Sequence, residues 1–389
     1  MRRTTLFVYF SLVFVIALFS GFVWFNRSLS QLSKFPAEGR KSHLRLAYDF
    51  QSPQTVDEYY ANTKRFSVVI VTHKEALLEK TYPIKKNVLN ILENTPKNRL
   101  QEVLIVDDAN DPPITWNPDP EHVRIVRSDE RLGLIRARIL GGNSAGGDLI
   151  AFLDAHCRVS PKWLDSPYRL IMENNRTIVN FVDFIMNEDF SVKPASNGIG
   201  SSASIYKTLR QFWGGGSRTD DYTPITMGMF AISKYWWNMG QMDPALQIWG
   251  GENVEISFRT WLCGGRIVVA RDSYVAHLFR TKPSYTYDVS LVTKNYIRVA
   301  HIWLDEPSLK EFYKEHNLVY TPGVLPESVG DISDRLKLKE DLHCKPFSTY
   351  LEMFKGRTFC PSPSNGCGST YSVIPSDITE SVNTIFNIE

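Results

Sequence analysis

The chain has 389 residues, of which 43% are hydrophobic, and a formal net charge of +2. That length suffices for one large domain or two small ones. The near-neutral charge balance gives no electrostatic case for binding nucleic acid. Five cysteines without a C-x-x-C pair argue against a zinc ribbon.

The N-terminus predicts a membrane anchor. The run from Leu6 to Phe25 carries no charge and is long enough to span a bilayer as a helix. Arg2 and Arg3 before it favour a cytosolic N-terminus. A cleaved signal peptide is the alternative, but the run is long for one and no A-x-A cleavage site follows. We therefore expect a cytoplasmic tail over residues 1–5, a transmembrane anchor over residues 6–25, and a body that faces an oxidising lumen.

The next segment, residues 26–65, is polar and has no clear hydrophobic period, so we expect a stem or linker there. Two patterns for N-glycosylation occur in the chain. Asn26 lies in one of them, very close to the predicted membrane, and Asn175 lies in the other, which is the better candidate.

From Phe66 onwards, apolar β-branched runs alternate with helical patterns. Strands are expected over residues 66–71, 102–106, 123–126, 149–153 and 266–270. Helices are expected over residues 77–92 and 134–143 and from residue 252 to the Cys-Gly-Gly at 263–265. Strands and helices that alternate at this length indicate an α/β fold with a mainly parallel central sheet.

An Asp-x-His motif, Asp154 and His156, follows the expected strand 149–153. Open α/β sheets bind ligands beyond the carboxyl ends of their strands. A carboxylate and an imidazole placed there can hold a divalent cation, and mixed oxygen and nitrogen ligands suit Mn²⁺ among others. Taken alone, the motif is more often an Asp that caps the next turn and a His on the surface.

An acidic pair, Asp107 and Asp108, ends the expected strand 102–106. A carboxylate at a strand end can accept hydrogen bonds from a ribose or a base imide, or it can cap the strand. The chain has no G-x-G-x-x-G after its first strand and no Walker lysine motif, which argues against a dinucleotide site or a P-loop.

A second dense stretch begins at Trp249. The two glycines at 250 and 251 allow the backbone to approach a ligand closely. Glu252 and Asn253 offer hydrogen-bonding groups suited to sugar hydroxyls, and Trp249 offers an apolar face for a sugar ring. His277 further on would, alone, more often be structural than a ligand.

Together these motifs resemble the polypeptide N-acetylgalactosaminyltransferases. The resemblance rests on Asp108 and on residues 131–138, 152–157, 249–259 and 277–280, which occur in the family's order. It covers about Phe66 to Tyr350 and implies a GT-A nucleotide-sugar transferase fold, with a catalytic domain over residues 66–350. Members of this family are Golgi type II membrane enzymes. They transfer N-acetylgalactosamine from UDP-N-acetylgalactosamine to Ser or Thr of a protein acceptor, with retention at the anomeric carbon and Mn²⁺ as cofactor.

The resemblance also assigns roles to single residues. The metal ligands would be Asp154, His156 and His277. The nucleotide contacts would be His73, Asp108, Arg131, Arg280 and Tyr285. The donor-sugar contacts would be Arg138, Gly228, Trp249, Glu252 and Asn253, and the residues counted as catalytic would be Asp154, His156, Glu252 and Asn253. Because no carboxylate stands out as a covalent nucleophile, a front-face reaction fits better than a double displacement.

Some positions depart from the family's pattern. Met227 stands where a glycine is usual, next to the expected sugar site, and the stretch from Ser196 to Asp221 matches poorly. Residues 351–389 form a short tail, too short for the family's lectin domain, which we expect to be absent. A non-catalytic Golgi relative that binds UDP-sugar or peptide is therefore the alternative function. An inverting galactosyltransferase, which shares a Trp-Gly-Gly-Glu core, is a more distant one.

The resemblance implies one disulfide, between Cys263 and Cys344. Cys157, inside the Asp-x-His-Cys motif, is expected to be a buried free thiol. Cys360 and Cys367 are candidates for a bridge within the tail.

Overall fold

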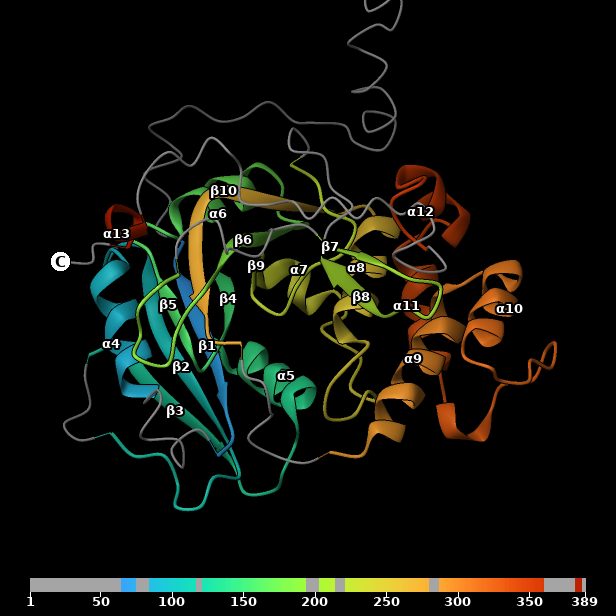
Figure 1. Ribbon diagram of the computed structural model, residues 1–389, viewed down its shortest axis with the longest axis horizontal. Helices are drawn as coiled ribbons and strands as arrows, with labels where there is room; N and C mark the ends of the chain where they lie inside the picture. Colours follow the sequence, from blue (N-terminus) through green and yellow to red (C-terminus); the bar gives the residue numbers. More distant parts are fainter. Residues whose placement is uncertain are drawn as a thin grey trace, which may run out of the picture. The chain divides into compact units, whose positions relative to one another are not determined.

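The structure is a computed structural model that describes residues 64–74, 84–116, 121–193, 203–213, 221–279, 287–359 and 382–386 (Figure 1). The expected cytoplasmic tail and anchor lie outside these residues, as does all of the expected stem except its last two positions. Within the described ranges, no helix combines the length and apolar character that crossing a membrane requires.

A central sheet of eight strands organises the described part of the chain, in the order β3-β2-β1-β4-β9-β6-β10-β5. The strands are β1 (Phe66–Thr72), β2 (Leu100–Asp108), β3 (Val123–Ser128), β4 (Leu149–Asp154), β5 (Cys157–Val159), β6 (Thr177–Ile185), β9 (Phe230–Ser233) and β10 (Arg266–His277). A separate hairpin is formed by β7 (Ala203–Ile205) and β8 (Gln211–Trp213).

Strand direction confirms a mostly parallel sheet. Strands β3, β2, β1 and β4 are parallel neighbours, and so are β6 and β10. The short β9 runs antiparallel between β4 and β6, and β5 pairs antiparallel with the end of β10. In the register of β1, Thr72 lies beside Asp107 and Val71 beside Asp154. The carboxyl ends of β1, β2 and β4 therefore meet at one edge of the sheet.

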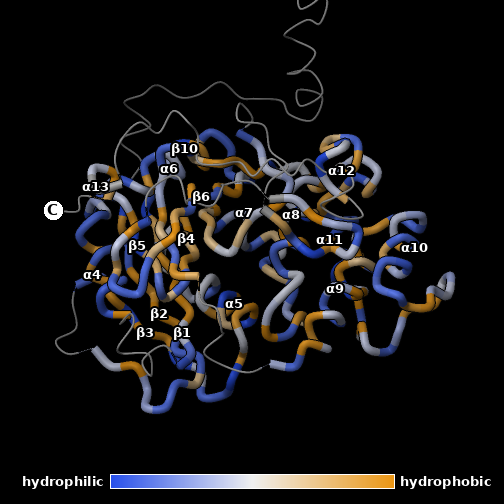
Figure 2. Tube along the Cα trace, in the orientation of Figure 1, coloured by the Kyte–Doolittle hydropathy of each residue, from blue (hydrophilic) through white to orange (hydrophobic). Residues whose placement is uncertain are grey.

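Helices cover both faces of the sheet (Figure 1). On one face, α4 (Ile84–Asn94) and α6 (Asp165–Glu173) pack in the same buried cluster as Val68 and Ile70 of β1. On the opposite face lies α5 (Leu134–Ser144), so close that a Cβ on Gly141 would fall 2.4 Å from Val69 Cγ1. Only glycine permits this approach. The strands at the centre are correspondingly apolar (Figure 2).

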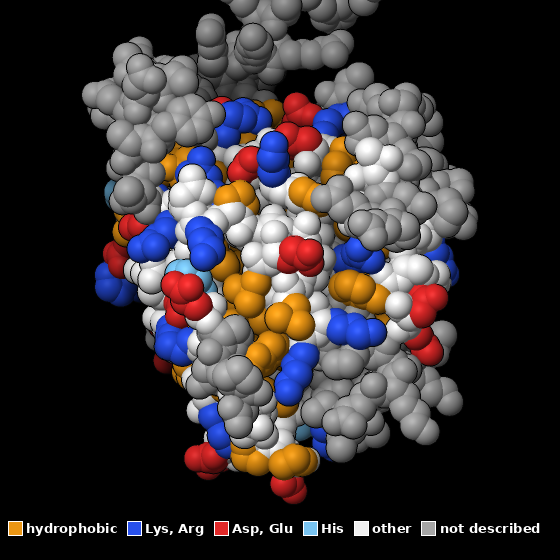
Figure 3. Space-filling view, turned by 90° about the vertical axis from the view of Figure 1, so that its left-hand side faces the viewer, with side chains coloured by type: hydrophobic (Ala, Val, Ile, Leu, Met, Phe, Trp, Pro, Cys, Tyr) orange, Lys and Arg blue, Asp and Glu red, His pale blue; other side chains and the backbone are white. Residues whose placement is uncertain are grey.

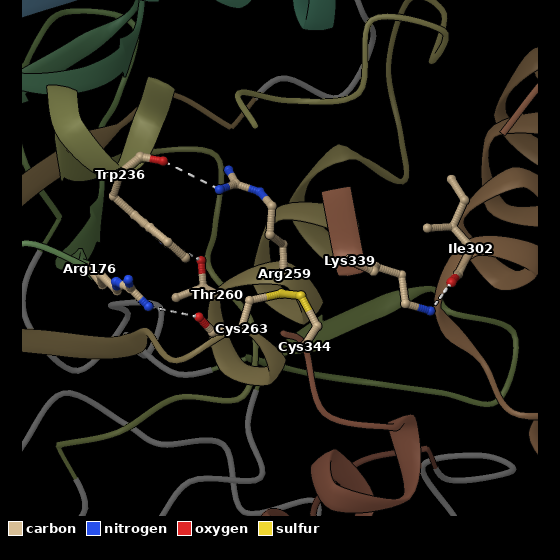
Figure 4. Close-up of a disulfide and its surroundings, with 8 residues drawn as sticks. All are labelled: Arg176, Trp236, Arg259, Thr260, Cys263, Ile302, Lys339 and Cys344. Carbon is tan, nitrogen blue, oxygen red and sulfur yellow. Dashed lines mark hydrogen bonds between the residues drawn. A yellow bond between two sulfur atoms is a disulfide. The ribbon is translucent and has the colours of Figure 1, made fainter. Parts of the chain in front are cut away.

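The C-terminal half is helical and adjoins the sheet through α7 (Lys234–Asn238) and α8 (Glu252–Leu262). It continues through α9 (Val289–Trp303), α10 (Glu306–Glu315), η3 (Glu327–Val329), α11 (Ser333–Asp341) and α12 (Phe347–Met353). The structure contains the implied Cys263–Cys344 disulfide, which ties the end of α8 to the segment after α11 (Figure 4). Cys157 is buried and forms no disulfide with any residue that the structure describes.

The short helix α13 (Val382–Ile385) packs against the sheet, with Phe386 in edge contact with Phe184 of β6 at 5.5 Å between ring centroids. Part of the expected tail thus belongs to the folded body. On the face that carries α4 and α13, basic and acidic side chains are interspersed (Figure 3). No large patch of a single charge sign is seen there.

Several elements differ from the sequence expectation. Residues 75–83, where the first helix was expected to begin, lie outside the described ranges, and α4 is described from Ile84 to Asn94. Strands β5, β6 and β9 were not expected. The separate strand expected over residues 266–270 is the first part of the twelve-residue β10, whose register with β6 shifts between Val269 and Tyr274.

Candidate active site

Three metal-ligand candidates meet at the carboxyl edge of the sheet. Asp154 ends β4, His156 lies in the turn that follows, and His277 ends β10. The antiparallel pairing of β5 with β10 places His277 opposite Cys157, next to the Asp-x-His turn. His277 Nε2 lies 3.1 Å from His156 Nε2 and 3.3 Å from Asp154 Oδ2. One ligand atom from each residue lies within 4.8 Å of the others.

The charges around Asp154 keep it ionised. Burial opposes ionisation, but the hydrogen bond with His277 and the positive charge of Arg138 outweigh it and hold the pKa of Asp154 well below its usual range. Arg138 is almost fully buried, and its Nη2 lies 3.0 Å from Asp154 Oδ1. An anionic carboxylate and two imidazoles form a donor set that fits a divalent cation such as Mn²⁺.

The expected nucleotide contacts His73, Asp108 and Arg131 also come together at this edge. His73 Nδ1 lies 2.6 Å from the carbonyl oxygen of Asp108, and Arg131 pairs with the Asp108 carboxylate. That carboxylate is fully buried and also accepts hydrogen bonds from the backbone N–H groups of Leu132 and Gly133, at 2.6 and 3.0 Å. Asp108 therefore positions the 131–133 turn in this structure.

Its neighbour Asp107 caps the end of strand β2, which is the alternative that the sequence left open. The fully buried Asp107 carboxylate accepts hydrogen bonds from the backbone N–H groups of Asn110 and Ile114 and from Arg127. The two remaining nucleotide candidates, Arg280 and Tyr285, lie outside the described residues.

Two glycine-containing loops close over the site. Gly133 has a φ of 79° and packs so tightly on the second loop that a Cβ there would lie 2.5 Å from Ile248 Cα. In the second loop, Gly250 and Gly251 have φ values of 93° and 90°. Residues other than glycine rarely adopt this backbone conformation, with a positive φ. The glycines therefore fix the approach of Trp249 and the start of α8.

The first turn of α8 presents unsatisfied polar atoms. Glu252 and Asn253 are nearly buried, and within the described residues Glu252 Oε2 and Asn253 Oδ1 have no hydrogen-bond partner. Burial raises the pKa of Glu252, although the charge of Arg138 opposes this. Leaving buried polar atoms unpaired is costly, so such atoms at a helix N-terminus are suited to receive ligand hydroxyls.

A cavity of about 450 Å³ opens in front of these residues. The candidates Trp249, Glu252 and Asn253 line it, together with Met227 and others: Arg210, Gln211, Phe212, Gly250, Gly251, Tyr287, Val289, Val292 and Tyr296. Gly228 connects the cavity to the metal candidates, because a Cβ on it would lie 3.5 Å from Arg138 Nη2 and 4.0 Å from Asp154 Oδ2. The structure thus joins the two dense motifs of the sequence in one site.

Sequence reasoning missed Asn295, which lies on α9 and is nearly buried. Its Nδ2 donates to the carbonyl oxygens of Gln247, Trp249 and Gly250, and its Oδ1 accepts from Gln247 N–H. One side chain therefore holds the glycine loop in place. No local signal marks an asparagine some 46 residues from its partners.

Comparisons with known proteins agree with this arrangement. Residues 67–237 match the family described as glycosyl transferase family 2. The chain is 32% identical over 347 residues to polypeptide N-acetylgalactosaminyltransferase 3 of Drosophila melanogaster, covering 82% of this chain and 50% of the relative. It is 34% identical over 342 residues to polypeptide N-acetylgalactosaminyltransferase 6 of Homo sapiens, covering 81% and 54%.

Among solved structures, the fold is similar to a crystal structure of GalNAc-T7 with UDP, GalNAc and Mn²⁺, with a TM-score of 0.62 and 28% identity. That match covers 75% of this chain and 56% of the other. The fold is therefore of the GT-A type, as the resemblance implied. The chain spans about half the length of the curated relatives it matches. Over that part, the chain is similar to the polypeptide N-acetylgalactosaminyltransferases.

Proposed function

We propose that this protein transfers N-acetylgalactosamine from UDP-N-acetylgalactosamine to Ser or Thr hydroxyls of proteins, and so starts mucin-type O-glycans. The observation that carries the proposal is one continuous site. A cluster of Asp154, His156 and His277 adjoins a cavity whose inner wall is formed by Glu252 and Asn253. The similarity to polypeptide N-acetylgalactosaminyltransferases supports this choice among sugar transfers.

In this proposal, Asp154, His156 and His277 would hold Mn²⁺, and the bound ion would supply positive charge that stabilises the diphosphate as a leaving group. Arg138 keeps Asp154 ionised and oriented. His73, Asp108 and Arg131 contact the nucleotide in this proposal, and the same role is expected for Arg280 and Tyr285, which lie outside the described residues. The donor sugar is bound by Arg138, Gly228, Trp249, Glu252 and Asn253.

Transfer proceeds with retention by a front-face route. Among the described residues that line the cavity, Glu252 alone carries a carboxylate, and its raised pKa makes it a poor anionic nucleophile. Glu252 and Asn253 instead hold the sugar hydroxyls, while the departing phosphate accepts the proton of the acceptor hydroxyl. The aromatic face of Trp249, which lines the cavity, helps to exclude water from the donor.

The decisive test is transfer by the purified full-length chain. It is incubated with UDP-N-acetylgalactosamine, Mn²⁺ and a library of Ser- and Thr-containing peptides, and the products are identified by mass spectrometry. A peptide heavier by one N-acetylhexosamine, with an α-linkage in NMR spectra, is expected. Absence of the modified peptide with intact donor, or a β-linkage, would overturn the proposal.

A second candidate is a Golgi relative that binds UDP-sugar or peptide without efficient transfer. The observation in its favour is Met227, which lines the cavity and stands beside Gly228, where the resemblance calls for a smaller residue. Binding of UDP-N-acetylgalactosamine with Mn²⁺, seen by calorimetry without peptide modification, would favour this candidate.

The proposed location is the Golgi membrane, with the catalytic body in the lumen. Residues 6–25 form the anchor and residues 26–65 the stem in this proposal. Microscopy of the full chain against a Golgi marker, together with protease protection of the body in sealed vesicles, tests it. A protein released from the membrane by carbonate washing would contradict the anchor.

A further inference from the structure

The β7–β8 hairpin presents a cation to the cavity. Within its turn, Tyr206 N–H donates to the carbonyl oxygen of Arg210 at 3.0 Å, and Leu209 N–H donates to that of Tyr206 at 2.9 Å. The Leu209 side chain is fully buried. The rings of Tyr206 and Phe212 stack at 4.2 Å across the base of the turn. Arg210 therefore projects from an ordered turn.

Helix α10 anchors this turn from outside. Lys207 Nζ forms an ion pair with Glu311 at 2.7 Å, and His316 Nε2 lies 3.0 Å from the carbonyl oxygen of Thr208. The two contacts are made by consecutive residues of the turn, Lys207 and Thr208. The position of Arg210 relative to the cavity is thus set by the body of the protein.

Arg210 is the cation of the cavity wall. It is exposed, and no side-chain hydrogen bond or ion pair links it to any residue that the structure describes. Glu252, which lines the same cavity, is buried and has a raised pKa. The buried Tyr296 also lines the cavity, and its pKa is raised by burial and by Glu252, while Arg210 opposes the rise. Arg210 is therefore within electrostatic reach of the cavity floor.

The remaining wall is aromatic. Trp249 and Tyr287 are both more than one-third exposed, and their ring centroids lie 6.3 Å apart. Arg210 and Glu252 line the same cavity as these rings, so a peptide bound there can present a neighbouring side chain to Arg210 while its hydroxyl approaches the sugar site at Glu252. Arginine binds carboxylates through a planar fork of donors, which gives it selectivity for an acidic side chain.

We propose that Arg210 is a specificity-determining residue that selects protein acceptors with an Asp or Glu close to the modified Ser or Thr. This inference rests on the proposed transferase function and names its acceptor class. Because the guanidinium is exposed, the preference is modest, about two- to five-fold in affinity, and weakens as salt is added.

The diphosphate of the donor is the other anion that Arg210 could meet, and the test separates the two. The full-length chain is compared with Arg210→Ala and Arg210→Glu. Lys97→Glu is the matched control, because Lys97 is exposed in the turn before β2, at the opposite edge of the sheet, and makes the same change in charge. Melting temperatures verify that each variant is folded.

The substrates are labelled peptides that differ only in carrying Glu, Gln or Lys at one position within three residues of a single Thr. Peptide binding is measured by fluorescence anisotropy with UDP and Mn²⁺, and transfer is measured in parallel. The wild type and Lys97→Glu are expected to favour the Glu peptide by about two- to five-fold at some position. Arg210→Ala should lose this preference, and Arg210→Glu should favour the Lys peptide.

Equal binding of the three peptides by the wild type would overturn the inference. So would an unchanged peptide preference in Arg210→Glu with a raised KM for UDP-N-acetylgalactosamine, which would assign Arg210 to the donor. A wild type that binds the Glu peptide preferentially but transfers no sugar to any peptide would refute the proposed function alone.

Discussion

The Asp154 carboxylate has two partners, a metal-ligand candidate and a buried cation, so it has both a proposed catalytic role and a structural one. Its Oδ2 faces His277, and its Oδ1 pairs with the nearly buried Arg138. Although the position at a strand end would suggest that an alanine is harmless to the fold, that change would leave a buried guanidinium without its charge partner. Breaking such a pair costs about 3–5 kcal/mol. The metal site should therefore be tested at a ligand whose replacement costs less folding stability.

His277→Ala is the cleaner probe, since it leaves the Asp154–Arg138 pair in place. We expect Mn²⁺ to raise the melting temperature of the wild type and not that of His277→Ala, and we expect transfer to fall by more than about 100-fold. Excess EDTA should have the same effect on the wild type. His343→Asn, at an exposed histidine with a φ of 52°, is the control. Near-normal transfer by His277→Ala would remove the metal role.

The size of the Met227 side chain bears on how the donor sugar fits the cavity. It is half-buried and lines the cavity next to Gly228. If it crowds the sugar, Met227→Gly should raise transfer or admit bulkier donors, because an overfilled site costs about 1–3 kcal/mol. Transfer from UDP-N-acetylgalactosamine and from UDP-N-acetylglucosamine is measured with each protein. A lower melting temperature without any gain in rate would show that Met227 is a packing residue.

At the scale of elements, the site is built by two loops and the helix that holds them. The turn at 131–133 is fixed by the carboxylate of Asp108, and the glycine loop at 247–250 is fixed by Asn295. The two loops touch where Gly133 meets Ile248. Helix α9 thus sets the position of Trp249 and Glu252 through Asn295, although Asn295 is not among the residues that line the cavity.

Asn295→Ala should therefore impair the site more than the fold. Its loss leaves carbonyl oxygens of the loop unpaired, which costs about 1–3 kcal/mol each when they are buried. We expect kcat/KM to fall about 10- to 100-fold while the disulfide and the metal response of the melting temperature persist. Asn295→Asp keeps the acceptor for Gln247 N–H, so its kcat/KM should lie between that of the wild type and that of Asn295→Ala. An unchanged kcat/KM would show that the glycines alone hold the loop.

At the scale of the whole molecule, a disulfide and hydrogen bonds around it hold the helical half together beside the site. The disulfide from Cys263 to Cys344 closes a loop of 81 residues. Around it, Arg176 donates to the carbonyl oxygen of Cys263, and Lys339 donates to that of Ile302 (Figure 4). The segment it closes contains α9, so the element that holds the glycine loop is itself held in place.

Replacing both cysteines, Cys263→Ala with Cys344→Ala, should lower the free energy of unfolding by about 4 kcal/mol, because a loop of this length loses that much entropy constraint in the unfolded chain. Urea unfolding of the unreduced proteins measures it. Cys360→Ser with Cys367→Ser is the matched control, which removes two cysteines outside this loop. A free Cys263 thiol in peptide maps, or a loss below about 1 kcal/mol, would contradict the expectation.

Much of the fold could be predicted because its signals are local. The strands β1, β2, β3 and β4 are short, apolar and bounded by charge, and α5 and α8 begin and end where their patterns do. Strand β6 gave no such signal, since the buried Asn180 and Asp183 interrupt its apolar run. Strand β9 has four residues, which is too few for a periodic pattern.

For the site, the sequence by itself determined which chemistries were available: an Asp-x-His turn at a strand end, a glycine pair before a helix, and a third histidine far along the chain. These are properties of residue type and spacing. Only the tertiary structure decided that His277 reaches Asp154, that Asp107 caps while Asp108 holds a turn, and that Asn295 and Arg210 serve the same cavity. Apart from the local cap that Asp107 forms with Asn110, these contacts join residues that are far apart in the sequence and are brought together by strand pairing or helix packing. The energies that fix such contacts depend on partners that the local sequence does not contain.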